Sequence, residues 1–168
     1  MEKWNSYTRD GKLTDTVLSR GEPIPEGLYH VACEILIRHV DGDYLLMKRS
    51  ILKSDWGGMY EAGAGGAMQY GETLHECARR EMKEETGLDA GELTEIGKTI
   101  DDGMHIIVYS YFTTVDCPKN SVTLQYGETE GYKWVSEKDF INFINSGEMI
   151  DRSRERLDGY FRKIGYVK

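Results

Sequence analysis

The sequence predicts a mixed α/β fold in a single domain. Its 168 residues suit one domain. Strand-like apolar segments stand before and after a mid-chain helical segment, and two further helical segments follow. This order lacks the regular strand–helix alternation of a doubly wound parallel sheet. We divide the chain into an amino-terminal strand and loop extension at 1–28, a core at 29–145 and a carboxy-terminal helix at 146–168.

The first half of the predicted sheet comes from short, apolar segments. The polar, turn-rich extension contains two strand-like pieces, Trp4–Tyr7 and Thr16–Leu18. Tyr29–Arg38 is rich in β-formers and largely apolar, which indicates a buried strand. An Asp-Gly-Asp turn signal at 41–43 predicts a hairpin into a further strand, Tyr44–Arg49.

The central helix has clear signals at both ends. Met59–Ala62 predicts a short extended piece, and we expect the glycine-rich residues that follow it to form a loop. Thr73–Thr86 then predicts a helix, because Thr73 and Glu76 match a capping box and Gly87 is a good helix stop.

The second half of the chain predicts three strands and two helices. Leu93–Ile100 and Met104–Val115 read as longer strands, and Tyr132–Val135 as a short one. Helices are expected at Ser136–Asn145, with Ser136 as its cap, and at Asp151–Arg162. The core-facing stripe of the last helix is expected to contain Leu157, Tyr160, Phe161 and Ile164.

Composition and charge exclude several classes of protein. The formal net charge of −8 argues against non-specific nucleic-acid binding, which needs a basic surface. No apolar run approaches the roughly 18 residues of a membrane span, and no signal-peptide core is visible. The three cysteines form no C-x-x-C pair, so we expect no disulfide framework and no thiolate zinc site. Cys33 and Cys77 are predicted to be small buried hydrophobes, and a cytoplasmic location follows by default.

Three glutamates of the central helix lie at one-turn spacing. At about 100° per residue, Glu81, Glu84 and Glu85 fall within an arc of roughly 100°, on the stripe that should face the core. The ordinary interpretation of such a helix is a solvated acidic face. Here the like charges would resist burial without a counter-cation. A hard divalent cation with oxygen ligands resolves that conflict.

This arrangement resembles the Nudix box, the family signature G-x5-E-x7-R-E-U-x-E-E-x-G-U, where U is aliphatic. The specified positions are filled here by Gly66, Glu72, Arg80, Glu81, Met82, Glu84, Glu85, Gly87 and Leu88. The resemblance implies the Nudix fold, an α/β/α sandwich around a mixed sheet. It also implies hydrolysis of a nucleoside diphosphate linked to another group, by Mg²⁺- or Mn²⁺-dependent water attack on phosphorus.

The resemblance also implies roles for individual residues. Glu81 and Glu85 match primary metal ligands, and Glu81 is also a catalytic candidate. Glu84 matches a ligand or the general base. The carbonyl group of Gly65, just before the box, matches a backbone ligand.

Further candidates lie outside this ligand set. Glu72 and Arg80 are expected to form a structural ion pair that shapes the loop against the helix. A glutamate six residues before Trp134, Glu128, is expected either to be a base or extra ligand or to be a plain loop residue, with Glu130 in reserve.

Residues on the predicted strands give weaker signals. Arg49 either contacts a substrate phosphate or is a solvated strand end. Trp56 and Tyr60 either border a base-binding cleft or belong to the core. We expect His30 and His105 to be packed or hydrogen-bonded rather than metal ligands.

Two alternatives to hydrolysis stay open. Arg20-Gly21, 25–27, Tyr29-His30 and Trp56 resemble a Nudix branch related to isopentenyl-diphosphate isomerase, although the cysteine expected after the tryptophan segment is missing. A non-catalytic nucleotide-binding module is the other alternative, although such modules usually lose box glutamates. The expected partner is a small-molecule diphosphate, with neither nucleic acid nor membrane. The family resemblance suggests a homodimer, for which the amino-terminal strands are candidate contacts, and the oligomeric state stays open. The identity of the substrate stays open.

Overall fold

The structure, a computed structural model, describes residues 1–168. The strands are β1 Lys3–Tyr7, β2 Leu13–Ser19, β3 His30–His39, β4 Tyr44–Arg49, β5 Tyr60–Ala62, β6 Ala64–Ala67, β7 Thr94–Asp101, β8 Ile106–Val115 and β9 Thr129–Val135. The helices are α1 Leu74–Thr86, α2 Glu137–Asn145 and α3 Asp151–Lys163, and a 3-10 turn, η1, covers Lys119–Ser121.

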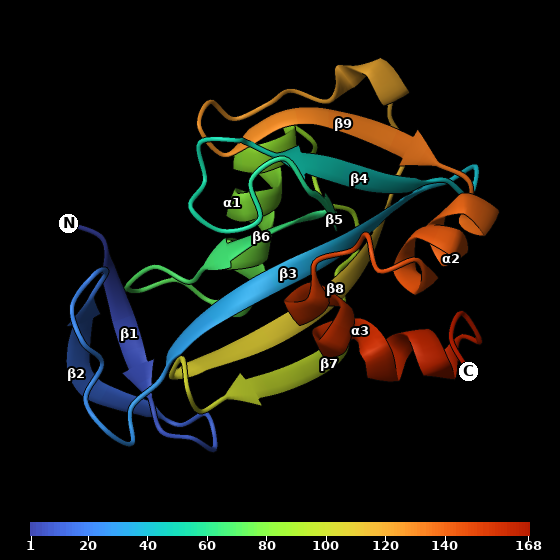
Figure 1. The fold of residues 1–168 in the computed structure, drawn as a ribbon. Helices are drawn as coiled ribbons and strands as arrows, with labels where there is room; N and C mark the ends of the chain where they lie inside the picture. Colours follow the sequence, from blue (N-terminus) through green and yellow to red (C-terminus); the bar gives the residue numbers. More distant parts are fainter.

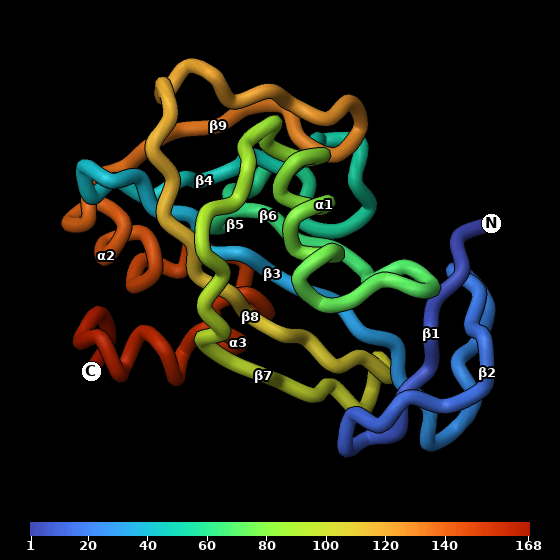
Figure 2. The backbone as a smooth tube through the Cα atoms, turned by 180° about the vertical axis from the view of Figure 1, so that it is seen from behind, coloured from blue at the N-terminus to red at the C-terminus, as the bar shows by residue number.

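A seven-stranded mixed sheet forms the middle layer. Its main strand order is β5-β4-β3-β8-β7, with β6 paired to β3 and β9 paired to β4. The neighbours β3 and β8 run parallel over their whole length, whereas the other pairs are antiparallel. Helix α1 covers one face of the sheet, and α2 and α3 cover the other (Figures 1 and 2). The predicted α/β/α sandwich is therefore confirmed.

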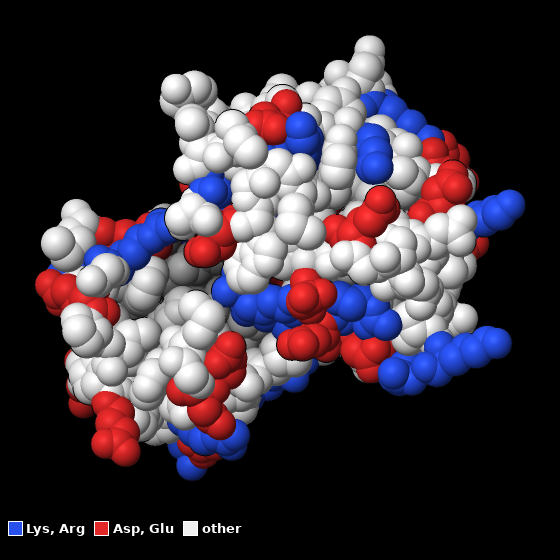
Figure 3. Space-filling view, in the orientation of Figure 1, with Lys and Arg blue, Asp and Glu red and all other residues white.

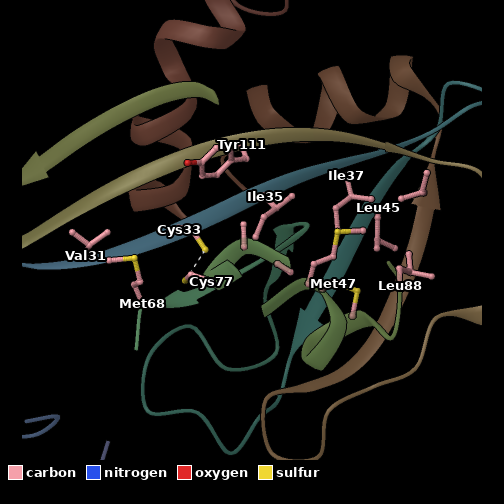
Figure 4. Packing of buried hydrophobic residues seen from close by; sticks show 14 of the residues in the cluster. Val31, Cys33, Ile35, Ile37, Leu45, Met47, Met68, Cys77, Leu88 and Tyr111 are labelled. Atoms are coloured by element: carbon pink, nitrogen blue, oxygen red, sulfur yellow. Dashed lines mark hydrogen bonds between the residues drawn. The ribbon is translucent and has the colours of Figure 1, made fainter. Parts of the chain in front are cut away.

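Strand β3 divides the interior into two cores because successive side chains of a strand point to opposite faces. Its odd-numbered residues, such as Cys33 and Ile35, pack with α1 in the first core. Leu36 packs with α2 and α3 in the second core. Figure 4 shows the first core, in which the Sγ atoms of Cys33 and Cys77 lie 3.3 Å apart. Both thiols are free and buried, as the sequence predicted.

The glycine-rich segment is a strand and not the expected loop. β6 pairs antiparallel with β3, with Gly66 opposite Cys33 and Gly65 opposite Glu34. A Cβ atom on Gly65 would lie 2.5 Å from the carbonyl oxygen of Cys33. These glycines therefore serve close packing of two backbones. That need gives the same sequence signal as a turn, which is why the prediction was wrong here.

Helix α1 has the ends that the sequence predicted. The Thr73 side chain accepts a hydrogen bond from the backbone N–H of Glu76, and the Glu76 carboxylate accepts one from the backbone N–H of Thr73. Gly87 closes the helix with a left-handed φ of 73°. These caps fix where the helix starts and thereby the direction in which its glutamates point.

The β1–β2 hairpin stands beside the sheet, at the end away from α2 (Figure 2). A single bridge between Tyr7 and Tyr29 connects it to the start of β3. Arg9 adds an ion pair to Asp102 at 2.8 Å. β2 is longer than the predicted piece. None of the helices combines the length and apolar character needed to cross a bilayer.

Candidate active site

A cleft of about 480 Å³ lies between the β1–β2 hairpin, β6 and α1. Most of the predicted site residues line it together. They are Arg49, Gly65, Arg80, Glu81, Glu84, Glu85 and Glu128. Glu72 lies behind this surface and reaches it only through Arg80.

Glu85 is a buried carboxylate without a cationic partner. Its side chain belongs to a residue that is only 8% exposed, and its one hydrogen bond comes from the backbone N–H of Gly65 at 3.0 Å. Burial raises the pKa of Glu85 well above its ordinary value, and the nearby carboxylate of Glu61 raises it further. An uncompensated negative charge at this depth favours a bound cation.

Arg80 holds the first turns of α1 against the segment before it. Its guanidinium group contacts Glu72 through two nitrogens, at 2.5 and 2.9 Å. It also donates to Glu81 at 2.6 Å and to the carbonyl oxygen of Ala67 at 3.0 Å. The hydrogen bond from Arg80 lowers the pKa of Glu72. This fork fixes the end of β6 relative to the helix.

Glu81 lies directly against Gly66. A Cβ atom added to Gly66 would come within 2.4 Å of the Glu81 carboxyl group. Burial raises the pKa of Glu81, while the Arg80 guanidinium opposes that shift. The missing side chain of Gly66 therefore leaves space for the Glu81 carboxylate, which extends from α1 into the cleft.

Glu84 differs from its two neighbours. The prediction placed it on the core-facing stripe, but its side chain is 44% exposed and touches Arg80 at 3.2 Å. It lies at the rim of the cleft because the stripe is narrower than the arc of the three glutamates. Met82 and Glu85 define the buried face instead.

The loop glutamates lie at the opposite rim. Glu128 lines the cleft and forms an ion pair with Lys53. Glu130 points elsewhere, pairing with Lys48 at 2.8 Å and accepting from the backbone N–H of Ile51. Of the two, only Glu128 faces the box glutamates.

The donor set suits a hard divalent cation. As the side chains stand, no three His, Cys, Asp or Glu side chains converge tightly enough to hold an ion. Arg80 is the shared ion-pair partner of Glu81 and Glu84. Glu85, in contrast, has no counter-charge, and it shares the cleft with Glu81, Glu84 and the backbone of Gly65. Mg²⁺ and Mn²⁺ prefer such oxygen donors, and Mg²⁺ needs only one or two carboxylates beside its waters.

The wall opposite α1 contains residues that the sequence did not assign to the site. Trp4 of β1 stacks on His30, with ring centroids 4.3 Å apart. Both line the cleft, together with Glu2 and Arg20. Their sequence signal is weak, since an aromatic residue on a short strand usually belongs to a core. His30 is packed, as predicted, and burial lowers its pKa to about 4.

Arg49, the last residue of β4, lines the cleft. It contacts the Glu61 carboxylate at 3.1 Å. Glu61, on β5, was not predicted as a site residue, although a glutamate in a short, half-buried strand is a signal that could have found it. Tyr60 packs against the second core, and Trp56 does not belong to either core.

Comparison with known proteins identifies the family. The sequence profile described as NUDIX domain matches residues 28–155. The chain belongs to the Nudix family. This membership confirms the predicted enzyme class, a Nudix-type pyrophosphohydrolase.

Individual Nudix relatives agree with the assignment. An uncharacterised Nudix hydrolase of Listeria monocytogenes is 28% identical over 153 residues, which cover 89% of each chain. The nucleoside triphosphatase NudI of Escherichia coli is 32% identical over 118 residues, which cover 61% of this chain and 79% of NudI. The crystal structure of DR0079 from Deinococcus radiodurans shares the fold, with a TM-score of 0.72, 19% identity and coverage of 95% of this chain and 99% of that one.

Proposed function

We propose that this Nudix protein hydrolyses a pyrophosphate bond in a nucleoside diphosphate linked to another group, with Mg²⁺ or Mn²⁺ as its cofactor. The observation that carries the proposal is the buried Glu85 carboxylate, which faces a cleft beside Glu81 and has no cationic partner. The name of the relative NudI, a nucleoside triphosphatase, supports a nucleotide derivative as the substrate.

Glu81, Glu85, Glu84 and the carbonyl group of Gly65 are the proposed ligands of the ion. When bound, the ion supplies positive charge to the phosphate oxygens and makes a water molecule more acidic. The protein's own part is to hold these oxygen donors in place. Arg80 does so by fixing the end of β6 against α1.

A proton must leave the water that attacks phosphorus. Two carboxylates at the rim are accessible enough to accept it, Glu84 at 44% and Glu128 at 37% side-chain exposure. Arg49 and Lys53 line the same cleft, which supports them as the proposed contacts of the phosphate oxygens. Comparing Glu84→Gln with Glu128→Gln identifies the base, because only loss of the base removes the acidic limb, which is the fall of metal-saturated activity at low pH caused by protonation of the base.

The deciding experiment is a substrate panel with and without metal. Phosphate-containing products of nucleoside diphosphate derivatives are measured with added Mg²⁺, with Mn²⁺ and with a chelator. We expect metal-dependent turnover that Glu85→Gln removes. The matched control is Glu76→Gln on the same helix, since glutamine also serves in a capping box.

Other outcomes identify the alternatives. Full activity in Glu85→Gln or in the chelator contradicts the proposed mechanism. Conversion of isopentenyl diphosphate without phosphate release would indicate the isomerase, and binding of a nucleotide that stays intact would indicate a sensor module. The homodimer and the cytoplasmic location stay predictions, and size-exclusion chromatography with light scattering tests the first of them.

A further inference from the structure

A second cavity adjoins the catalytic cleft. It has a volume of about 200 Å³ and lies between β6 and the amino-terminal half of α3. The two spaces share the residues His30, Arg49, Gly65, Gly66, Ala67 and Ile106. The two spaces therefore adjoin along β6, and together they are called the recess below.

The carboxylates of this cavity already have partners. Glu61 is paired with Arg49 at 3.1 Å. Glu34 accepts a hydrogen bond from the hydroxyl group of Ser110 at 2.6 Å. The nearest cation to Glu34 is Arg156, at 4.0 Å, and burial raises the pKa of Glu34 to about 7, so this carboxyl group contributes less than a full negative charge to the cavity at neutral pH.

Arg156 of α3 is a poorly satisfied guanidinium group. Its side chain is only 15% exposed, and its nearest carboxylate oxygen, on Glu34, lies 4.0 Å away. Arg156 donates no hydrogen bond within the protein, although a guanidinium group carries five N–H donors. Burial lowers its pKa. The protein thus keeps a desolvated cation at the cavity without the hydrogen bonds that normally offset its burial.

Arg152, one helical turn earlier, is the second cation without an acidic partner. Its guanidinium group stacks over the ring of Trp56 at 4.7 Å, and it has no carboxylate within 4.0 Å. Its polar contact is the sulfur atom of Met104 at 3.5 Å. The Trp56 ring and the Met104 sulfur thus hold the guanidinium in place at the cavity without neutralising its charge.

The cavity therefore carries excess positive charge. Three arginines line it, Arg49, Arg152 and Arg156, against the two glutamates. The surrounding protein has a net charge of −8. On the face drawn in Figure 3, basic side chains form a band in the region of α3, with acidic side chains over its middle and beside it. A local excess of guanidinium groups in an acidic protein is the arrangement expected where an anion binds.

We propose that this cavity binds a phosphate group that the substrate carries at the end opposite to its nucleoside, held by Arg156 and Arg152. The proposal rests on the proposed function and narrows its substrate class to diphosphates with an additional phosphate on the linked group. The forked guanidinium matches phosphate with two parallel hydrogen bonds. The volume lies below the about 300 Å³ of pockets that enclose a whole ligand, so it suits one end of a substrate. An uncharged group here would leave both guanidinium groups unpaired.

Binding of ribose 5-phosphate to the full chain tests this site directly. Isothermal titration calorimetry is carried out in a chelator, so that no metal ion can recruit the phosphate to the catalytic cleft. Ribose, which lacks the charge, is the neutral comparison. We expect ribose 5-phosphate to bind and ribose not to bind.

Substitutions on α3 then locate the binding. Arg156→Gln and Arg152→Gln are each expected to weaken ribose 5-phosphate binding by about tenfold or more, the effect of losing charge-assisted hydrogen bonds. Arg156→Lys should recover only part of the affinity, because lysine keeps the charge and loses the fork. Arg162→Gln is the matched control on the same helix, since Arg162 is exposed and pairs with Asp158 outside the cavity.

Thermal unfolding of Arg152→Gln and Arg156→Gln shows whether each variant is folded, so loss of binding cannot be mistaken for loss of structure. Equal affinity in wild type, Arg152→Gln and Arg156→Gln overturns the proposal, as does absence of binding to the wild type. Since the titration needs neither metal nor turnover, its failure is distinguishable from failure of the proposed hydrolysis.

Discussion

The backbone N–H of Gly65 donates a hydrogen bond to the carboxylate of Glu85 at 3.0 Å. This contact joins the strand before the box to the helix at its end. It also presents the charged side chain of Glu85 to the cleft while leaving that charge without a cation. Stability and activity therefore make opposite demands on Glu85.

Glu85→Gln is expected to stabilise the metal-free protein while removing activity. The amide oxygen still accepts from Gly65, and the buried charge is gone. The gain comes from removing a buried negative charge that no cation compensates in the metal-free protein. Because burial raises the pKa of Glu85 above its ordinary value of 4.5, the folded state binds the proton more tightly, and the wild type loses stability as pH rises past 4.5.

Urea unfolding in a chelator at about pH 5 and about pH 8 measures this difference. The advantage of Glu85→Gln should grow with pH. A variant that is less stable than wild type at the higher pH would show that the carboxylate is already compensated without metal.

Breaking the Arg80–Glu72 pair is expected to loosen the end of β6. Arg80→Lys keeps the charge but cannot span the two carboxylate oxygens at 2.5 and 2.9 Å. A double-mutant cycle with Glu72→Gln should give a coupling free energy of about 1 kcal/mol in urea unfolding. Additive effects of the two substitutions would contradict a structural role for the pair.

Gly66→Ala is expected to remove most of the activity. The new methyl group would lie 2.4 Å from the Glu81 carboxyl group, so that carboxylate must move. A displacement of about 1 Å at a reacting centre can reduce kcat/KM by about a hundredfold. Gly103→Ala is the control, because its methyl group would meet nothing closer than 3.4 Å. Wild-type kinetics in Gly66→Ala would remove Glu81 from the proposed ligand set.

Acid is expected to destabilise the protein through His30. Burial lowers the pKa of His30 from 6.5 to about 4. Between these two pH values the histidine is protonated in the unfolded chain and neutral in the folded chain. This penalty is absent above pH 6.5 and grows as pH falls from 6.5 to about 4. His30→Gln should lose less stability than wild type across that window. His75→Gln, at an exposed position of α1, should follow the wild type.

Gly159→Ala is expected to stabilise α3. Gly159 lies inside the helix, and a Cβ atom there would meet nothing within 4 Å. Alanine should raise the free energy of unfolding by about 0.5–1 kcal/mol, because glycine loses more backbone entropy on folding. Thermal unfolding measures the gain, and hydrolysis should be unchanged. A lower melting temperature would mean that the helix axis shifts when the methyl group is added.

The sequence predicts those parts of the structure that depend on local signals. α1 begins after Thr73 and ends at Gly87 as predicted, because a capping box and a left-handed glycine are local features. The buried strand β3 was likewise predicted, because its run of apolar β-formers is visible in its own residues. Most of the predicted site residues share one cleft because most of them come from β6 and α1, which are neighbours in the sequence.

The remaining features depend on contacts between distant segments. The glycines of β6 were predicted as a loop because nothing nearby in sequence shows that β3 lies against them. Trp4 lines the cleft and Arg156 lines the second cavity only because the β1–β2 hairpin and α3 pack beside β6 in the folded chain. The exposure of Glu84 depends on how wide a stripe of α1 the sheet covers, which a helical wheel does not contain.

The recess takes its floor from residues 65–85 and its side walls from the β1–β2 hairpin and α3, which lie at opposite ends of the described chain. A substitution in either wall can therefore change which molecule fits without moving the carboxylates beneath it. Hydrolytic capacity and choice of substrate are separable properties in such an architecture. Homologues with the same floor residues can accordingly differ in substrate specificity through changes in the wall residues alone.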